Sequence, residues 1–326
     1  MLSLKSTASI VLTGWSGVGK TEQAKLVFDA VFPSWALAFK NPADLPTTAH
    51  PFRPMLVISC ETSTSGTMGK ILSHPDCTFI AVDNLEEFTA ALTVLDHGHG
   101  AKYDAEGTLT QYGTPFRSVF FDGWTALTEG SKGDARILAL AEAGGDKTLA
   151  GTAKQNDERV MSKAAAAEIR NAQRLWVGAG AKPQHKGLLM LSTAHADQKW
   201  APKPGSKQGE RSQIGEQLDL PPKAARWLMN NANLCLYLGR ILPDVQDIND
   251  LDAEDEPDMV PFYFALTRPL SSGGGTYQYD LIKWQDGIIR TRTKWNHPDL
   301  GAALLESPLL ITPPAPKPSK VPTPAA

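Results

Sequence analysis

Short apolar runs alternate with amphipathic stretches along most of the chain. The runs are rich in β-branched and aromatic residues, which is typical of buried strands. We expect strands at residues 8–13, 55–60, 77–82, 118–121, 187–193 and 234–238. Helices are predicted at residues 20–30, 85–95, 135–143 and 156–176. This alternation predicts an α/β fold with a mostly parallel central sheet that helices cover on both faces.

The C-terminal third follows a different pattern. Three antiparallel strands are predicted at residues 262–267, 277–284 and 288–294, and a glycine triplet and an Asp-Gly pair supply the turns between them. Before them, residues 244–258 carry eight acids and no base, which indicates a solvated loop. We therefore divide the chain into a core (1–243), an acidic loop (244–260), a β-hairpin extension that continues the core sheet (261–300) and a Pro-rich disordered tail (301–326).

Composition narrows the class of protein. Of the 326 residues, 42% are hydrophobic and 21% charged, which excludes a wholly disordered, collagen-like or coiled-coil chain. A net charge of −3 excludes a globally polybasic nucleic-acid coat. The three cysteines form no CxxC pair, which argues against a zinc knuckle. Because no apolar run approaches the roughly 18 residues that span a bilayer, we expect a cytoplasmic protein without a membrane partner.

One glycine-rich segment carries a specific chemical signal. Residues 14–21 satisfy the pattern G-x-x-x-x-G-K-[ST] in full, and a predicted strand precedes them and a helix follows. Glycines allow successive backbone N–H groups to point at one anion, and the helix adds its positive N-terminal end. The segment predicts a phosphate-binding loop for a nucleoside triphosphate, ATP or GTP, made of Gly14, Trp15, Ser16, Gly17, Val18, Gly19, Lys20 and Thr21.

Besides the loop, a nucleotide site needs an acid that helps to hold the magnesium ion. Asp122 ends the apolar strand at 118–121, and open α/β sheets bind ligands at the carboxyl ends of their strands. We therefore expect Thr21 and Asp122 to hold Mg²⁺, while Lys20 reaches the β- and γ-phosphates. The alternative is that Asp122 has only a structural role and opens an ordinary strand-to-helix turn with Gly123.

The order of these elements resembles the RecA-like ATPase core. The resemblance rests on the glycine-rich loop, the strand ending in Cys60-Glu61-Thr62, the run FFDGWTAL and the run LLMLSTAH. The resemblance covers roughly residues 6–294. Within this superfamily the chain is most similar to phage-encoded RecA-like ATPases linked to single-strand annealing and recombination. The resemblance implies an ATP-hydrolysing homo-oligomer that acts on single-stranded DNA, in the cytoplasm of a bacterial host if phage-encoded.

The resemblance also implies roles for single residues. Glu61 matches the acid that polarises the attacking water, and His195 matches the γ-phosphate sensor, where RecA itself carries glutamine. Both positions are also compatible with structural roles at strand ends. The loop after the predicted strand at 187–193 matches the DNA-contacting loop, and a mobile surface loop is its alternative reading. The basic and aromatic residues of that loop are Lys199, Trp200, Lys203, Lys207 and Arg211.

Two further features of the C-terminal part remain open. Arg290, Arg292 and Lys294 share one face of a predicted strand. In RecA-like assemblies such cations complete a neighbouring subunit's ATP site, but a basic row can equally protect a sheet edge from aggregation. The Pro-rich tail either docks a single-strand-binding protein or only aids solubility.

Two other functions are also compatible with the predicted phosphate-binding loop. One is a P-loop kinase for a nucleoside or another small molecule, which would require an arginine-rich lid that the sequence does not display. The other is a nucleotide-switch adaptor similar to a helicase loader, in which hydrolysis is incidental.

Overall fold

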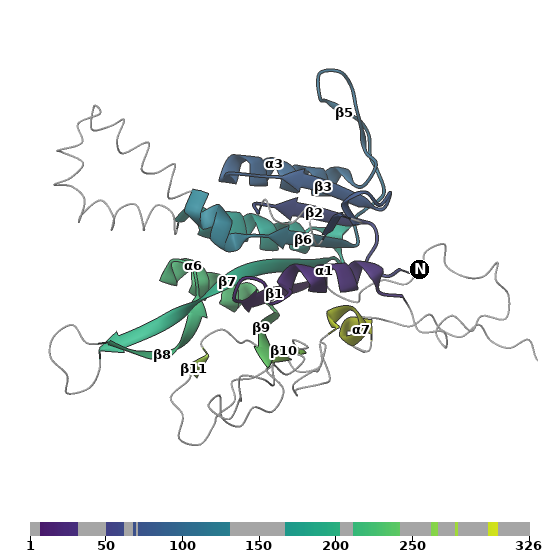
Figure 1. The fold of residues 1–326 in the computed structure, drawn as a ribbon. Helices are drawn as coiled ribbons and strands as arrows, with labels where there is room; N and C mark the ends of the chain where they lie inside the picture. Colours follow the sequence, from purple (N-terminus) through teal and green to yellow (C-terminus); the bar gives the residue numbers. More distant parts are fainter. Residues whose placement is uncertain are drawn as a thin grey trace, which may run out of the picture.

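Figure 1 shows the computed structural model of the chain. It describes residues 7–31, 50–61, 68–69, 71–130, 167–202, 211–241, 262–266, 278–279 and 299–305. Nine strands form the main sheet, with seven in the order β10-β9-β1-β7-β6-β2-β3. These seven are β1 (Ala8–Gly14), β2 (Met55–Ser59), β3 (Cys77–Ala81), β6 (Ser118–Asp122), β7 (Leu189–Pro202), β9 (Leu234–Ile241) and β10 (Phe262–Leu266).

Six of these strands run parallel, and β10 is antiparallel to β9. Every residue of β1, β2 and β6 is buried, as expected for central strands covered on both faces. The predicted α/β fold with a mostly parallel sheet is therefore confirmed. Because the strands are parallel, their carboxyl ends meet at one edge of the sheet, where β1, β2, β6 and β7 bring the predicted nucleotide residues together.

Helices cover both faces of the sheet. On one face, α1 (Lys20–Asp29) and the short α7 (Leu300–Leu305) pack with β1 and β2 around a shared cluster of buried side chains. The other face carries α3 (Leu85–His97), the helix at residues 167–181 and α6 (Pro222–Asn231). The structure confirms the helices predicted at 20–30 and 85–95. It also confirms the second half of the helix predicted at 156–176.

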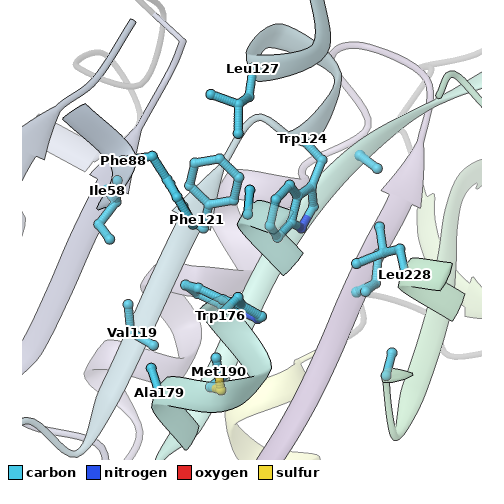
Figure 2. Packing of buried hydrophobic residues seen from close by; sticks show 14 of the residues in the cluster. Ile58, Phe88, Val119, Phe121, Trp124, Leu127, Trp176, Ala179, Met190 and Leu228 are labelled. Atoms are coloured by element: carbon cyan, nitrogen blue, oxygen red, sulfur yellow. The ribbon is translucent and has the colours of Figure 1, made fainter. Parts of the chain in front are cut away.

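Aromatic side chains dominate the core on the α3 face. Figure 2 shows Phe88, Phe121, Trp124 and Trp176 packed together with aliphatic side chains from the sheet and helices. Phe121 and Trp124 meet edge to face at 4.5 Å between ring centroids, and Trp124 and Trp176 at 6.1 Å. Because Trp124 is only two positions from Asp122, this packing fixes the chain directly after the predicted metal-binding acid.

A long β-arm leaves the main sheet at its carboxyl edge. From Ala196 onward, β7 pairs antiparallel with β8 (Arg211–Leu218), and Figure 1 shows the two strands extending away from the sheet. A separate two-stranded sheet, β4 (Lys102–Tyr103) with β5 (Leu109–Gln111), projects elsewhere. Neither the arm nor this small sheet is predicted by the sequence pattern.

The arm corrects one prediction. The sequence predicts an irregular loop at residues 199–211, but Lys199 and Trp200 lie in β7 and Arg211 begins β8. Pairing of Trp200 with Gln213 and of Pro202 with Arg211 keeps the chain extended. Pro202 fits there because, among the described strands, the arm part of β7 pairs only with β8, and a missing N–H is tolerated at such an edge.

The C-terminal part also differs from its prediction. The short strand β11 (Gln278–Tyr279) pairs parallel with β8, and not in an antiparallel hairpin with β10. Residues 301–305, assigned above to the tail, belong to α7, because Leu300 and Leu304 are buried against α1. The folded part of the chain thus includes residues 300–305.

Several predicted segments lie outside the described residues. They are the helix at 135–143, the first half of the helix at 156–176, the acidic loop at 244–260, the strand at 288–294 and residues 306–326. Among the helices that the structure does describe, none is both long and apolar enough to cross a bilayer.

Candidate functional site

The glycine-rich segment forms the connection between β1 and α1. Gly14, Gly17 and Gly19 have positive φ angles of 147°, 75° and 90°, a region that favours glycine. At Gly14 a Cβ atom would lie 2.4 Å from the carbonyl oxygen of Leu238 in β9, so this position also lacks space for a side chain. The predicted glycine-rich turn is therefore present, with a strand before it and a helix after it as the motif requires.

Lys20 lies almost fully inside this loop. Its side chain is buried, with the residue 6% exposed, and Nζ donates hydrogen bonds of 2.9 Å to the carbonyl oxygens of Gly14 and Trp15. Burial lowers the pKa of the Lys20 ammonium, while the nearby carboxylates of Glu61 and Asp122 act in the opposite direction. The loop thus folds around the ammonium group of Lys20.

Asp122 lies at the carboxyl end of β6 and is also buried, at 2% exposure. Its Oδ2 atom accepts a hydrogen bond of 3.2 Å from the hydroxyl of Thr21, the first-turn residue of α1. Its Oδ1 atom accepts a shorter bond of 2.6 Å from the hydroxyl of Thr193 in β7. The two residues predicted to hold the metal are therefore in direct contact, although they are 101 positions apart in the chain.

Glu61 and His195 form a second pair beside the loop. Glu61 Oε1 lies 3.1 Å from His195 Nε2, and a carboxylate can only accept, so this nitrogen carries the proton. The hydrogen bond from His195 lowers the pKa of Glu61, burial raises it, and the charge of Lys20 contributes to the net lowering. Glu61 is therefore held as a carboxylate close to Lys20.

Two hydroxyl groups fix the backbone around this pair. The Glu61 N–H donates to Ser59 Oγ at 3.0 Å, and the His195 N–H donates to Thr125 Oγ1 at 2.9 Å. The first bond closes a turn directly after β2, and the second links β7 to the segment that follows β6. The backbone is therefore fixed on both sides of the pair.

The residues present fit a magnesium–triphosphate group. Thr21 and Asp122 offer a hydroxyl and a carboxylate oxygen, the hard ligands that Mg²⁺ prefers. Within the part of the chain that the structure describes, no group of three or more His, Cys, Asp or Glu residues could hold a metal ion. A site with two protein oxygens is typical of Mg²⁺ that is otherwise bound by substrate phosphates and water. The open side of Gly17, where a Cβ would meet nothing within 4 Å, leaves the loop accessible.

The structure gathers only part of the predicted site. Lys20, Thr21, Glu61, Asp122 and His195 meet at one sheet edge, whereas Lys199, Trp200 and Arg211 lie on the arm. Lys203 and Lys207, and the predicted trans cations Arg290, Arg292 and Lys294, lie outside the described residues.

Sequence reasoning missed the hydroxyl residues that support the site. Ser59, Thr125 and Thr193 each hold a predicted site residue through a hydrogen bond. For Thr193 a signal existed, because it ends the predicted strand at 187–193 that leads to His195.

A comparison with known proteins finds no family model and no curated protein that matches the chain.

Proposed function

We propose that the chain binds a magnesium–nucleoside triphosphate at residues 14–21 and hydrolyses it. The observation that carries this proposal is the convergence of Lys20, the Thr21–Asp122 contact and the Glu61–His195 pair at the carboxyl edge of a parallel sheet. A chance glycine-rich turn would not require a buried lysine and a buried aspartate from another strand at the same point.

Each group has a specific role in this proposal. Lys20 donates to the carbonyl groups of Gly14 and Trp15 and would donate to phosphate oxygens in their place, while the loop N–H groups would bind the remaining phosphate oxygens. Thr21 and Asp122 would hold Mg²⁺, which would neutralise charge on the phosphates. Glu61, as a carboxylate, accepts the proton of the attacking water, and His195 orients that carboxylate.

The resemblance to RecA-like ATPases adds a partner to this chemistry. β7 carries His195 where it lies between β1 and β6, and the same strand then continues directly into the arm. Lys199, Trp200 and Arg211 are on the arm, where cations can follow a phosphate backbone and an aromatic ring can stack on a base. We therefore include single-stranded DNA as the partner and a homo-oligomer as the acting form.

Phosphate release, measured with and without single-stranded DNA, tests the proposal. Lys20→Ala removes charged hydrogen bonds worth roughly 1.5–3 kcal/mol and should weaken nucleotide binding about ten- to hundredfold. Its matched control is Lys25→Ala, which changes the same residue type in the same helix but removes only a half-exposed ion pair with Glu22. Wild-type activity equal to that of Lys20→Ala would contradict the proposal.

Glu61→Gln separates hydrolysis from binding. Loss of a general base should lower the rate of phosphate release by about 10²–10⁴-fold while nucleotide affinity remains. Glu86→Gln, an exposed acid in the first turn of α3, is the control and should match the wild type. Phosphate transfer to an added nucleoside would favour the kinase alternative, and tight binding with negligible turnover in the wild type would favour the adaptor.

A further inference from the structure

Thr193 connects the two halves of the candidate site without lying on the glycine-rich loop. It is fully buried in β7, with an exposed fraction of 0%. Its hydroxyl oxygen accepts a hydrogen bond of 2.9 Å from the Gly123 N–H. Because that oxygen is already an acceptor, its own proton is available for Asp122 Oδ1, which lies 2.6 Å away.

The strand register explains why this residue reaches Asp122. Phe121 of β6 pairs with Ser192 of β7, so Thr193 is in step with Asp122 on the next strand. On its other side Thr193 pairs with Leu12 of β1, two residues before the loop begins. Thr193 is therefore the point at which β7 bridges the loop strand and the strand that carries the acid.

The two oxygen atoms of Asp122 have different partners. Thr193 binds Oδ1, and Thr21 binds Oδ2, so the plane of the carboxylate is fixed from both sides. If Thr21 bound a metal ion instead of Oδ2, the bond from Thr193 to Oδ1 would still hold the carboxylate. Oriented in this way, Oδ2 stays directed toward Thr21.

We infer that Thr193 is a positioning residue that aligns Asp122 for the magnesium–triphosphate group. This inference rests on the proposed function, because it assigns Asp122 to the metal. Thr193 acts through Asp122 and touches neither substrate nor metal. Partners of this kind typically change metal affinity or activity by about 10–100-fold when removed.

The neighbouring strand offers a matched control. Thr13 of β1 is also fully buried, but its hydroxyl has no hydrogen-bond partner among the described residues. Thr→Val replaces the hydroxyl by a methyl group of similar size at either position. Thr13→Val thus tests the effect of the substitution alone, and Thr193→Val adds the loss of the bond to Asp122.

The experiment titrates the full-length variants with Mn²⁺ in the presence of ADP and measures free Mn²⁺ by electron paramagnetic resonance. We expect Thr193→Val to bind Mn²⁺–ADP at least about tenfold more weakly than Thr13→Val, and Thr193→Ser to recover most of that loss. The magnesium concentration for half-maximal phosphate release should rise in parallel. Equal Mn²⁺ affinity of Thr193→Val and Thr13→Val would overturn the inference.

Two controls keep the outcomes distinct. Thermal melts establish that each variant is folded, and Thr193→Cys replaces Thr193→Val in the same comparison if the valine variant is not. A wild-type protein without affinity for Mn²⁺–ADP would overturn the proposed function itself. A wild-type protein that binds, together with an unaffected Thr193→Val, would overturn only the role of Thr193.

Discussion

Gly14 offers a quantitative test of how closely the loop is packed against the sheet. In Gly14→Ala, the new Cβ would lie 2.4 Å from the backbone oxygen of Leu238 and 3.0 Å from Val18 Cγ2. The backbone of β9 cannot move without disturbing its pairing with β1, so relief of this contact costs about 1–3 kcal/mol. The φ angle of 147° adds roughly 1–3 kcal/mol for a residue with a side chain.

Gly17→Ala is the matched control for this substitution. Its φ of 75° imposes a similar backbone cost of roughly 1–3 kcal/mol, but its Cβ would meet no atom within 4 Å. Urea unfolding without nucleotide should show that Gly14→Ala lowers the free energy of unfolding by about 1–3 kcal/mol more than Gly17→Ala does. If the two variants agree within about 0.5 kcal/mol, the close packing of the loop on β9 is refuted.

Two further predictions concern pH and DNA. Partial burial raises the pKa of Asp96, but hydrogen bonds from Lys182 and His185 lower it overall, so this carboxylate stabilises the fold above about pH 4 and loses that effect as pH falls through its depressed pKa. The difference in melting temperature between the wild type and Asp96→Asn should therefore shrink below about pH 4. Replacing Lys203 and Lys207 with Ala should weaken binding of single-stranded DNA and flatten its dependence on salt.

Each of these predictions has a clear contrary result. A difference in melting temperature that stays constant from pH 7 to pH 3 would contradict the role assigned to Asp96. Unchanged DNA affinity and salt dependence in the double lysine variant would remove residues 203–207 from the DNA site. Lys102→Ala, on the separate sheet of β4 and β5, is the control for charge alone.

Local sequence signals were sufficient to predict the strands whose apolar pattern agrees with their burial in the structure. The central strands are continuous apolar runs because both faces are covered, and their positions matched the structure to within a few residues. The arm was missed because β7 changes its partners after His195, from the parallel β1 to the antiparallel β8. Beyond that point polar residues follow one another in the sequence, so no apolar alternation predicts a strand.

Contacts between distant parts of the chain could not be derived from local patterns. The Glu61–His195 pair joins residues 134 positions apart, and only the family resemblance suggested that both belong to one site. The bond between Thr193 and Asp122 depends on the order and register of strands, which no local signal encodes. α6 was missed because its N-cap residue, Pro221, supplies no side-chain cap, although Pro222 at the first helical position is typical of a helix start.

The central claim is that residues 14–21 bind a magnesium–nucleoside triphosphate. Isothermal titration of the full-length protein with a non-hydrolysable ATP analogue, with and without Mg²⁺, tests it most directly. We predict saturable binding that requires Mg²⁺, is weakened about ten- to hundredfold in Lys20→Ala and is unchanged in Lys25→Ala. Absence of binding to the wild type, or equal binding to Lys20→Ala, would contradict the claim.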